Sequence, residues 1–328
     1  MQTEIIAEIA QGYEGNPKLA ELLVKGAIVA NADSVKLQLV FADELCVPTY
    51  PYYALFKSLE MEENVWKNLV KMVHDAGKKI YFDVYGPHSI ELAHTLGADA
   101  VKISTTDFYN TALIKNAFKK FNKVFVSTGG VPVEDIDELM HTNGLPQHIT
   151  LMHGFQAEPT VAEDNNLKRI VTLQQRYPKA NIGFMDHSLG SSEEAFHLPL
   201  IALGLGVSCI EKHITLDYSL EIEDYISALS VDRFGAFVKT IRMIEPSLGS
   251  SELTLTAKET DYKKRAGKLA VAKHHLEKGT VITASDIEMK RVSTTPLEDH
   301  FPRSENVVGK TLLTALEKDQ PFQTSNVR

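Results

Sequence analysis

The stretch GFMDHSLG, residues 183–190, is an apolar run that ends on Asp186 and His187 and is then broken by a glycine. A second run, CIEKHITL (residues 209–216), carries a glutamate and a histidine towards its end in the same way. Short apolar runs bounded by turn residues are typical of buried strands. The two stretches therefore predict buried strands that place a carboxylate and an imidazole close together at their ends.

Outward from these two stretches, short β-branched runs alternate with longer amphipathic segments. The predicted strands are residues 4–10, 34–40, 79–85, 100–104, 123–129, 148–154, 181–188 and 208–214. The predicted helices lie near residues 17–31, 60–76, 88–96, 110–120, 133–142, 161–176, 191–206 and 231–246. Eight strand–helix units over roughly 250 residues match the size of a (β/α)8 TIM barrel. A doubly wound open sheet is the alternative, which is less favoured because no glycine-rich dinucleotide motif opens the first unit.

The pattern changes after the predicted barrel, which spans residues 1–248. Residues 249–265 are polar and poorly periodic, and we expect them to form a linker. Residues 266–328 contain the strand candidates KLAVAK, TVITASD and KTLLTAL, separated by turn signals. This segment predicts a separate, small β-rich domain. Because such a domain is too small to hold a large core, we expect it to dock against a barrel.

Composition excludes several classes of protein. The 328 residues are 44% apolar and 23% charged, as in ordinary globular proteins, and no apolar stretch approaches the ~20 residues that span a bilayer. The start MQTEIIAEIA is acidic where a signal peptide is basic. Cys46 and Cys209 cannot build a disulfide framework, so we expect a reducing cytoplasm. The net charge of −9 argues against a nucleic-acid partner.

Polar residues gather at the predicted C-terminal ends of the strands, where (β/α)8 barrels carry their chemistry. Lys36 and Lys102 lie inside apolar runs, where an unpaired charge is costly. Together with Ser127, Thr128 and backbone N–H groups after the fifth strand, they indicate a site for phosphate or carboxylate. The alternative is a structural network in which the lysines pair with acidic residues, namely Glu211, Asp186 or Asp83.

His187 and His213 end the adjacent seventh and eighth predicted strands, so one ion could reach both imidazoles. A lone histidine at a strand end is more often a hydrogen-bonded core residue, but two neighbours beside carboxylates favour a metal site. Mixed nitrogen and oxygen ligands suit Mn²⁺ or another first-row ion better than a closed structural zinc site. Such an ion would act as a Lewis acid on a carbonyl.

At these residues the chain resembles the NeuB family, the sialic acid (nonulosonic acid) synthases. Members of that family join a (β/α)8 barrel to a C-terminal antifreeze-like, or SAF, domain. The resemblance extends over most of the chain, and the segments that carry it are IIAEIAQGYEGN (5–16), ADSVKLQ (32–38), KVFVSTGG (123–130), MDHSLG (185–190), IEKHITLD (210–217), HHLEKGTVITASDIEMKR (274–291) and VVGKTLL (307–313).

The resemblance implies a C–C bond-forming transferase that condenses phosphoenolpyruvate with an open-chain 2-acylamino hexose and releases phosphate. His187 and His213 would bind Mn²⁺, with Mg²⁺ or Co²⁺ as substitutes, and Glu14 would lie near the attacked phosphoenolpyruvate carbon. The residues implied to bind phosphoenolpyruvate are Lys36, Lys102, Thr105, Ser127 and Gln156. Those implied to contact the sugar are Gln38, Asp107, Asp224 and Arg291. In this family the SAF arginine reaches the partner subunit's barrel, which implies a domain-swapped homodimer.

The chain also departs from the family pattern. Met185 replaces a serine expected near the phosphate, and Glu158 replaces a tyrosine. Gly12-Tyr13 replaces Asn-His, Thr105 a serine, Asp107 a glutamate and Gln156 an asparagine, while SLEIED before Asp224 lacks the family's proline- and glycine-rich turn. These departures indicate an altered acceptor sugar, and the candidates are N-acetylmannosamine, a related di-acetamido sugar or a less usual one. The alternatives are a non-catalytic sugar- or anion-binding protein, or a Schiff-base aldolase that uses Lys102 or Lys212.

Overall fold

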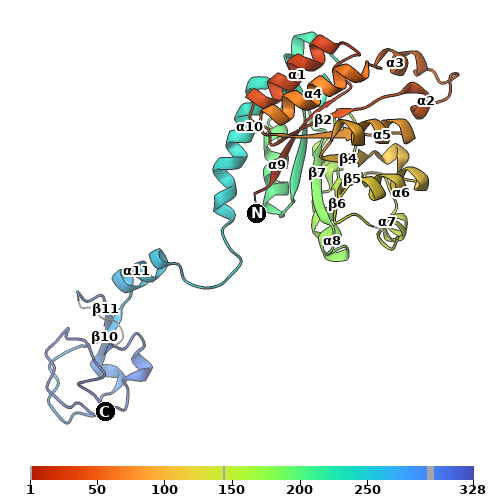
Figure 1. Ribbon diagram of the computed structural model, residues 1–328. Helices are drawn as coiled ribbons and strands as arrows, with labels where there is room; N and C mark the ends of the chain where they lie inside the picture. Colours follow the sequence, from red (N-terminus) through yellow and green to blue (C-terminus); the bar gives the residue numbers. More distant parts are fainter. Residues whose placement is uncertain (1, 143–144, 294–298) are drawn as a thin grey trace. The chain divides into compact units, whose positions relative to one another are not determined.

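The computed structural model describes residues 2–142, 145–293 and 299–328. The chain divides into two compact units, Met1–Gly249 and Ser250–Arg328. The first unit is a barrel of parallel strands inside a layer of helices (Figure 1). None of the helices in the described ranges is long and apolar enough to cross a membrane.

The barrel strands follow one another in chain order, and β1 also pairs with β8, which closes the sheet. A short strand, β9 (Leu229–Ser230), pairs with the end of β8. The closed parallel sheet confirms the (β/α)8 fold and excludes the doubly wound alternative. The eight strands are β1 (Glu4–Ala10), β2 (Ser34–Gln38), β3 (Lys79–Asp83), β4 (Ala100–Ile103), β5 (Lys123–Ser127), β6 (His148–His153), β7 (Asn181–Asp186) and β8 (Cys209–Thr215).

The helices begin and end for local reasons. Pro17 opens α1, and the Asn16 side chain accepts hydrogen bonds from the backbone N–H groups of Lys18 and Leu19. Gly97 ends α5 with a φ of +80°, which glycine adopts without strain. The helices that follow the strands are α1 (Pro17–Val29), α4 (Glu63–Asp75), α5 (Pro87–Leu96), α6 (Thr111–Lys120), α7 (Val133–Met140), α8 (Arg169–Arg176), α9 (Glu194–Gly204) and α10 (Val231–Ile244).

Some elements differ from the prediction. The connection after β2 contains two short helices that the sequence did not indicate, α2 (Ala42–Leu45) and α3 (Tyr53–Ser58). The helix expected over residues 161–176 starts only at Arg169, after a 3₁₀ turn. The 3₁₀ segments of the first unit are η1 (Thr105–Asp107), η2 (Ala162–Asn165), η3 (Tyr218–Leu220), η4 (Tyr225–Ser227) and η5 (Glu245–Leu248).

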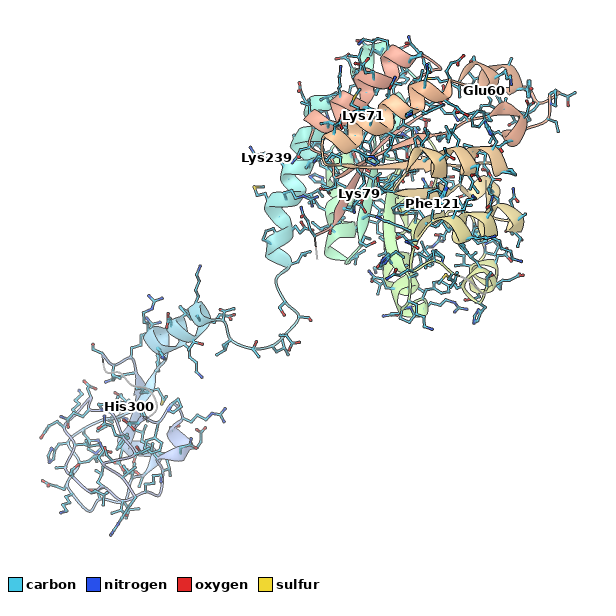
Figure 2. All side chains as sticks on the ribbon, in the orientation of Figure 1. Glu60, Lys71, Lys79, Phe121, Lys239 and His300 are labelled. Carbon is cyan, nitrogen blue, oxygen red and sulfur yellow. The ribbon has the colours of Figure 1, made fainter. Side chains whose placement is uncertain are left out.

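The main core lies between the barrel strands and the helices. In α4, Trp66 is fully buried and meets the rings of Tyr13 and Phe82 edge to face, at centroid distances of 5.4 and 5.7 Å. Such contacts add to the burial of three large apolar surfaces. On the opposite sides of the helices, Lys71 of α4 and Lys239 of α10 are exposed and extend into solvent (Figure 2).

Inside the barrel, each strand changes from apolar to polar along its inward face. Seven buried residues form one apolar cluster, here called the barrel floor: Ile6, Tyr81, Ala100, Phe125, Met152, Met185 and Cys209. Because side chains alternate along a strand, the residue two positions later points the same way. Those residues are Glu8, Asp83, Lys102, Ser127, Gly154, His187 and Glu211. A polar layer therefore lies directly above the floor, towards the C-terminal ends of the strands.

The second unit is a small β domain with its own core. Strand β10 (Leu269–Ala272) pairs antiparallel with β11 (Ile287–Lys290), and Ala270, Ile282 and Phe322 are among its core residues. Among the described residues of this unit, the 3₁₀ turns are η6 (Ala284–Asp286) and η8 (Ser304–Asn306). Of the predicted strands, only KLAVAK forms one; TVITASD and KTLLTAL make isolated bridges, such as Val281 with Thr311.

The predicted linker is partly helical. Helix α11 (Ala257–Ala266) lies within it, and Thr256 and Glu259 form a capping box at its start. The polar composition that indicated a linker is here that of an exposed helix with no buried residue. Local capping, rather than an apolar stripe, therefore marks this helix in the sequence.

Candidate active site

Five buried charged side chains form one network in the polar layer of the barrel. Lys36 Nζ lies 2.7 Å from Asp83 Oδ2 and 3.6 Å from Glu211 Oε1, and it also contacts Glu8. Lys102 Nζ lies 2.6 Å from Glu211 Oε1 and 3.9 Å from Asp83 Oδ2. Each of the five residues is at most 3% exposed. The lysines therefore form a network with acidic residues in the structure.

This network contains three carboxyl groups and two ammonium groups, so the lysines balance only two negative charges. Burial raises the pKa of Glu8 to about 8, and the nearby Glu211 and Asp83 oppose the effect of Lys36. Burial also acts on Glu211, but Lys102 and Lys36 outweigh it and lower the pKa of that carboxyl. Charge balance in a dry interior accounts for the difference. Glu8 is therefore the carboxyl of this network whose pKa lies closest to neutral pH.

The imidazoles of His187 and His213 face each other beside this network. Their ring centroids lie 5.2 Å apart, and the residues are 7% and 6% exposed. Burial lowers the pKa of His187 to about 4, and it lowers the pKa of His213 well below its usual value. Both rings are therefore neutral at pH 7, which is the form that binds metals. Within the described residues, Nδ1 of each ring is buried and has no hydrogen-bond partner.

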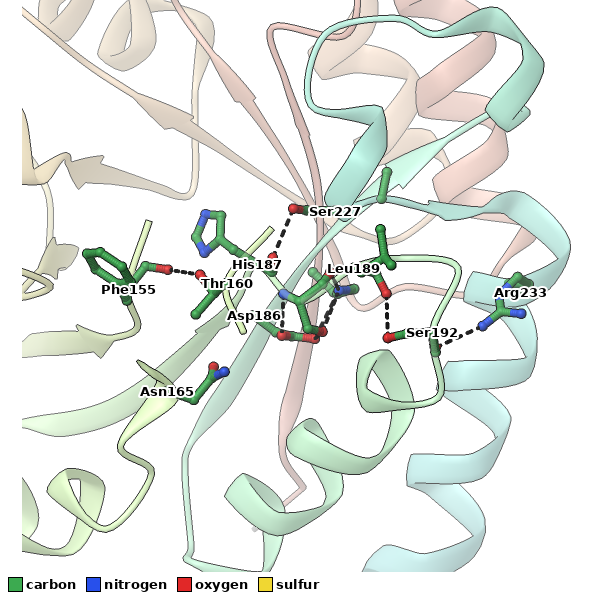
Figure 3. A network of polar contacts seen from close by, with 12 residues as sticks. Phe155, Thr160, Asn165, Asp186, His187, Leu189, Ser192, Ser227 and Arg233 are labelled. Atoms are coloured by element: carbon green, nitrogen blue, oxygen red, sulfur yellow. Dashed lines mark hydrogen bonds and ion pairs between the residues drawn. The ribbon is translucent and has the colours of Figure 1, made fainter. Parts of the chain in front are cut away.

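The backbone of His187 is fixed while its ring stays available. Its carbonyl oxygen accepts hydrogen bonds from Ser227 Oγ and from the backbone N–H of Thr160, each at 2.9 Å (Figure 3). The preceding residue, Asp186, pairs with Lys212 Nζ at 2.9 Å, and Ser188 donates to the same carboxylate. These contacts fix the backbone at the end of β7 and directly after it. Asp186 therefore supports the site rather than pairing with Lys36 or Lys102.

Glu158 approaches the two histidines from the loop after β6. One ligand atom from each of Glu158, His187 and His213 lies within 4.8 Å of the other two, so the three could hold one ion. Glu158 is exposed at the mouth of the cavity, where partial desolvation and the neighbouring Asp224, with which it shares a hydrogen bond, raise the pKa of Glu158 to about 8. Burial and Glu223 raise the pKa of Asp224 to about 6. Two carboxyl groups with raised pKa values, those of Glu158 and Asp224, therefore lie beside the two neutral imidazoles.

A cavity of about 330 Å³ opens over these groups. A larger cavity of about 560 Å³ lies at the loops after β5 and β6, but its lining, such as Gly130, Phe155 and Arg169, includes neither the lysines nor the paired histidines. The smaller cavity is therefore the candidate active site. The residues expected in the site that line it are Lys36, Gln38, Lys102, Gln156, His187, His213 and Asp224.

Two other expected residues lie next to the cavity without lining it. Ser127 is fully buried, and its Oγ donates a hydrogen bond to Met185 Sδ at 3.5 Å. Thr105 opens a 3₁₀ turn, and its buried Oγ1 has no hydrogen-bond partner within the described ranges. The neighbouring Ser104 and Thr106 line the cavity instead. The sequence did not indicate this turn, and its register decides which hydroxyl groups face the cavity.

The remaining expected residues lie elsewhere. Glu14 is exposed on the turn after β1, with a φ of +48°. Asp107 contacts Thr106 and Asn110, and burial raises its pKa. Arg291 belongs to the second unit, where its Nε donates to the carbonyl oxygen of Ala266 at 3.1 Å. Neither Glu14 nor Asp107 is among the residues that line the cavity.

Among the charged residues that line the cavity, Glu8 was not predicted, and Asp83 was predicted only as a structural partner of the lysines. Both lie on the inward face of a strand, two positions after a floor residue, so alternation along β1 and β3 could have identified them. Glu8 lines the cavity, whereas Glu14 does not. A charge within an otherwise apolar strand was the available signal.

The fold and the cavity define a class of protein, the (β/α)8 barrels that act at the C-terminal ends of their strands. Comparison with known sequences is more specific. The chain belongs to the NeuB family, whose pattern matches residues 23–253, and it carries a SAF domain over residues 268–328. Both matches confirm the resemblance found in the sequence.

Individual relatives agree with this assignment. An uncharacterized protein of Methanocaldococcus jannaschii is 30% identical over 88% of this chain and 85% of its own. An N,N'-diacetyllegionaminic acid synthase of Legionella pneumophila is 27% identical over 88% of this chain and 85% of its own. The crystal structure of N-acetylneuraminic acid (sialic acid) synthetase from Leptospira borgpetersenii superposes with a TM-score of 0.73 at 24% identity, over 80% of this chain and 92% of that one.

Proposed function

We propose that this protein is a nonulosonic acid synthase. It condenses phosphoenolpyruvate with the open-chain form of a 2-acylamino hexose and adds one water, giving a nonulosonic acid and inorganic phosphate. The observation that carries the proposal is one cavity that joins two buried lysines to two neutral histidines. The names of the legionaminic acid and neuraminic acid relatives support the same reaction class.

The lysines supply the binding site for phosphoenolpyruvate. Lys36 and Lys102 are already held in place by carboxylates, so the anionic substrate exchanges one set of negative partners for another. Such a preorganised pair needs little reorganisation when the anion binds. Glu8 is the group in this network that takes up or releases a proton near neutral pH, as general acid–base catalysis requires.

The histidines fit a divalent first-row ion. Their buried Nδ1 atoms without partners and their neutral state are the features expected of ligands for Mn²⁺, with Mg²⁺ or Co²⁺ as substitutes. Such an ion, when bound, supplies a Lewis acid that polarises the sugar aldehyde. Ser227 and Thr160 keep His187 in place for this role.

The rim of the cavity selects the acceptor sugar. Gln38, Gln156 and Asp224 line the open side and offer amide and carboxyl groups to sugar hydroxyls. The acceptor is N-acetylmannosamine or a related di-acetamido sugar. We further propose a cytoplasmic, domain-swapped homodimer, in which the partner subunit's Arg291 contacts the N-acyl group of the sugar.

Phosphate release tests the proposal. The protein is incubated with phosphoenolpyruvate, Mn²⁺ and a panel of 2-acylamino hexoses, with His187→Ala as the control. Release that depends on the sugar and is lost in the variant would support a synthase and would identify the acceptor class. No release with any sugar, in a protein that also fails to bind Mn²⁺, would favour a non-catalytic binding protein.

A further inference from the structure

The Glu158 side chain lies where a third protein ligand for the ion would be needed. Its carboxylate and the two imidazoles offer ligand atoms that all lie within 4.8 Å of one another. The histidines are more than nine-tenths buried, and each has an Nδ1 without a partner among the described residues. We propose that Glu158 completes a two-histidine, one-carboxylate metal site. This inference rests on the proposed function, because it concerns the ion that the proposed reaction uses.

The loop that carries Glu158 is tied to the first histidine. Thr160 donates its backbone N–H to the carbonyl oxygen of His187, and its Oγ1 lies 2.8 Å from the carbonyl oxygens of Phe155 and Ala157. Figure 3 shows His187, Thr160 and Phe155 side by side. The residues on both sides of Glu158 are therefore fixed relative to His187. A ligand on such a loop is positioned before the metal binds, which favours affinity.

Asp224 orients the Glu158 carboxylate from the other side. The two side chains share a hydrogen bond, and both line the same cavity. Groups that hydrogen-bond to a metal-ligating carboxylate fix its orientation and tune the site. Asp224 is thus a positioning residue for Glu158 rather than a further member of the ligand set.

The three-ligand site has a chemical consequence. Two imidazoles and one carboxylate leave several positions open on a first-row ion, as the oxygen atoms of a substrate require. When Glu158 binds the ion, it gives up its proton and adds a negative charge, which the two neutral imidazoles do not supply. The protein therefore binds Mn²⁺ without either substrate present, and Glu158 contributes to that affinity directly.

Mn²⁺ titration of the full chain without substrates tests this inference, with free Mn²⁺ measured by electron paramagnetic resonance. Glu158→Gln should raise the Kd by about tenfold or more, in the range known for groups around metal sites. Glu223→Gln is the matched control, because it removes an exposed neighbouring charge that lies outside the cavity lining; its Kd should stay within about twofold of wild type. Glu158→His should restore binding, since it offers a nitrogen ligand.

A spectroscopic readout separates ligation from a general charge effect. The visible absorption bands of bound Co²⁺ should change in Glu158→Gln and stay the same in Glu223→Gln. Equal losses of affinity in both variants, an unchanged Kd in Glu158→Gln, or no Mn²⁺ binding by the wild type would each overturn the inference. Because no substrate is present, a protein that binds Mn²⁺ through Glu158 but releases no phosphate would contradict the proposed function alone.

Discussion

Replacing Glu8 by glutamine tests whether the buried network holds a proton. Glutamine has the shape of a protonated glutamate and carries no charge. The network sets three carboxyls against two lysines, and Glu8 is the carboxyl whose pKa is raised to about 8. Glu8→Gln should therefore not lower the free energy of unfolding. Glu211→Gln should lower it, because it removes the charged partner of Lys102. The two variants replace different carboxyls of the same network, and we expect opposite effects on the free energy of unfolding.

The magnitude follows from proton linkage. Glu8 has an ordinary pKa of 4.5 in the unfolded chain and about 8 in the fold, so the folded state binds more protons between these values. The contribution of Glu8 to stability is thus fully present below pH 4.5 and falls by about 1.4 kcal/mol per pH unit up to pH 8. By pH 7 the wild type has lost about 3 kcal/mol of its free energy of unfolding through Glu8. Glu8→Gln loses none of this, because glutamine does not titrate. Glu211→Gln should instead lose about 3 to 5 kcal/mol, because it removes the charged partner that lies 2.6 Å from the buried Lys102 ammonium and leaves only Asp83 at 3.9 Å.

Urea unfolding followed by tryptophan fluorescence provides the assay. The chain has a single tryptophan, Trp66, which is fully buried in α4 of the barrel. Its emission therefore reports the barrel and not the second unit. Midpoints and slopes for wild type, Glu8→Gln and Glu211→Gln are compared from pH 5 to pH 8 without metal, and the slopes convert midpoints to free energies.

Two results would refute this reasoning. If Glu8→Gln destabilises the barrel at pH 7 as much as Glu211→Gln does, Glu8 is ionised and paired with Lys36. If the difference between wild type and Glu8→Gln stays constant from pH 5 to pH 8, the proton is held elsewhere. Either outcome would also remove Glu8 as the acid–base group of the proposed reaction.

Three further predictions concern other parts of the chain. A Cβ on Gly190 would lie 1.8 Å from the carbonyl oxygen of Ala228, so Gly190→Ala should destabilise the barrel by about 2 kcal/mol or more in urea unfolding; Gly204→Ala, with nothing within 4 Å, is the control and should not. Arg291→Ala should raise the KM for the sugar far more than that for phosphoenolpyruvate, and equal increases would contradict the proposed role of the SAF arginine. Borohydride with pyruvate should leave no adduct on Lys212, whose fully buried Nζ pairs with a carboxylate; an adduct found by mass spectrometry would revive the aldolase alternative.

The sequence predicted the barrel well, because its strands are short β-branched runs that end sharply at polar residues. All eight strands and the eight predicted helices were found, although the helix expected from residue 161 starts only at Arg169. The short helices α2 and α3 escaped, since neither is long enough to show a helical period. The histidine pair was predictable because adjacent strands bring their ends together.

The site was predicted less completely. That Lys36 contacts Glu8, Asp83 and Glu211 depends on the register of four strands, which no local pattern contains. Glu14 was chosen from its position after the first strand, whereas the alternation within that strand points Glu8 inwards. The positions of site residues on loops depend on loop conformation, which the sequence does not reveal. The approach of Glu158 to the two histidines is an example.

The barrel floor also has a kinetic meaning. Its seven apolar side chains fill the inside of the barrel beneath the charged layer. In the proposed reaction, the ligand bound to buried Lys36 and Lys102 lies deeper than the sugar, which lies near exposed Gln156. We therefore expect phosphoenolpyruvate to bind before the sugar. An ordered mechanism is thus set by architecture, and product-inhibition patterns would reveal it.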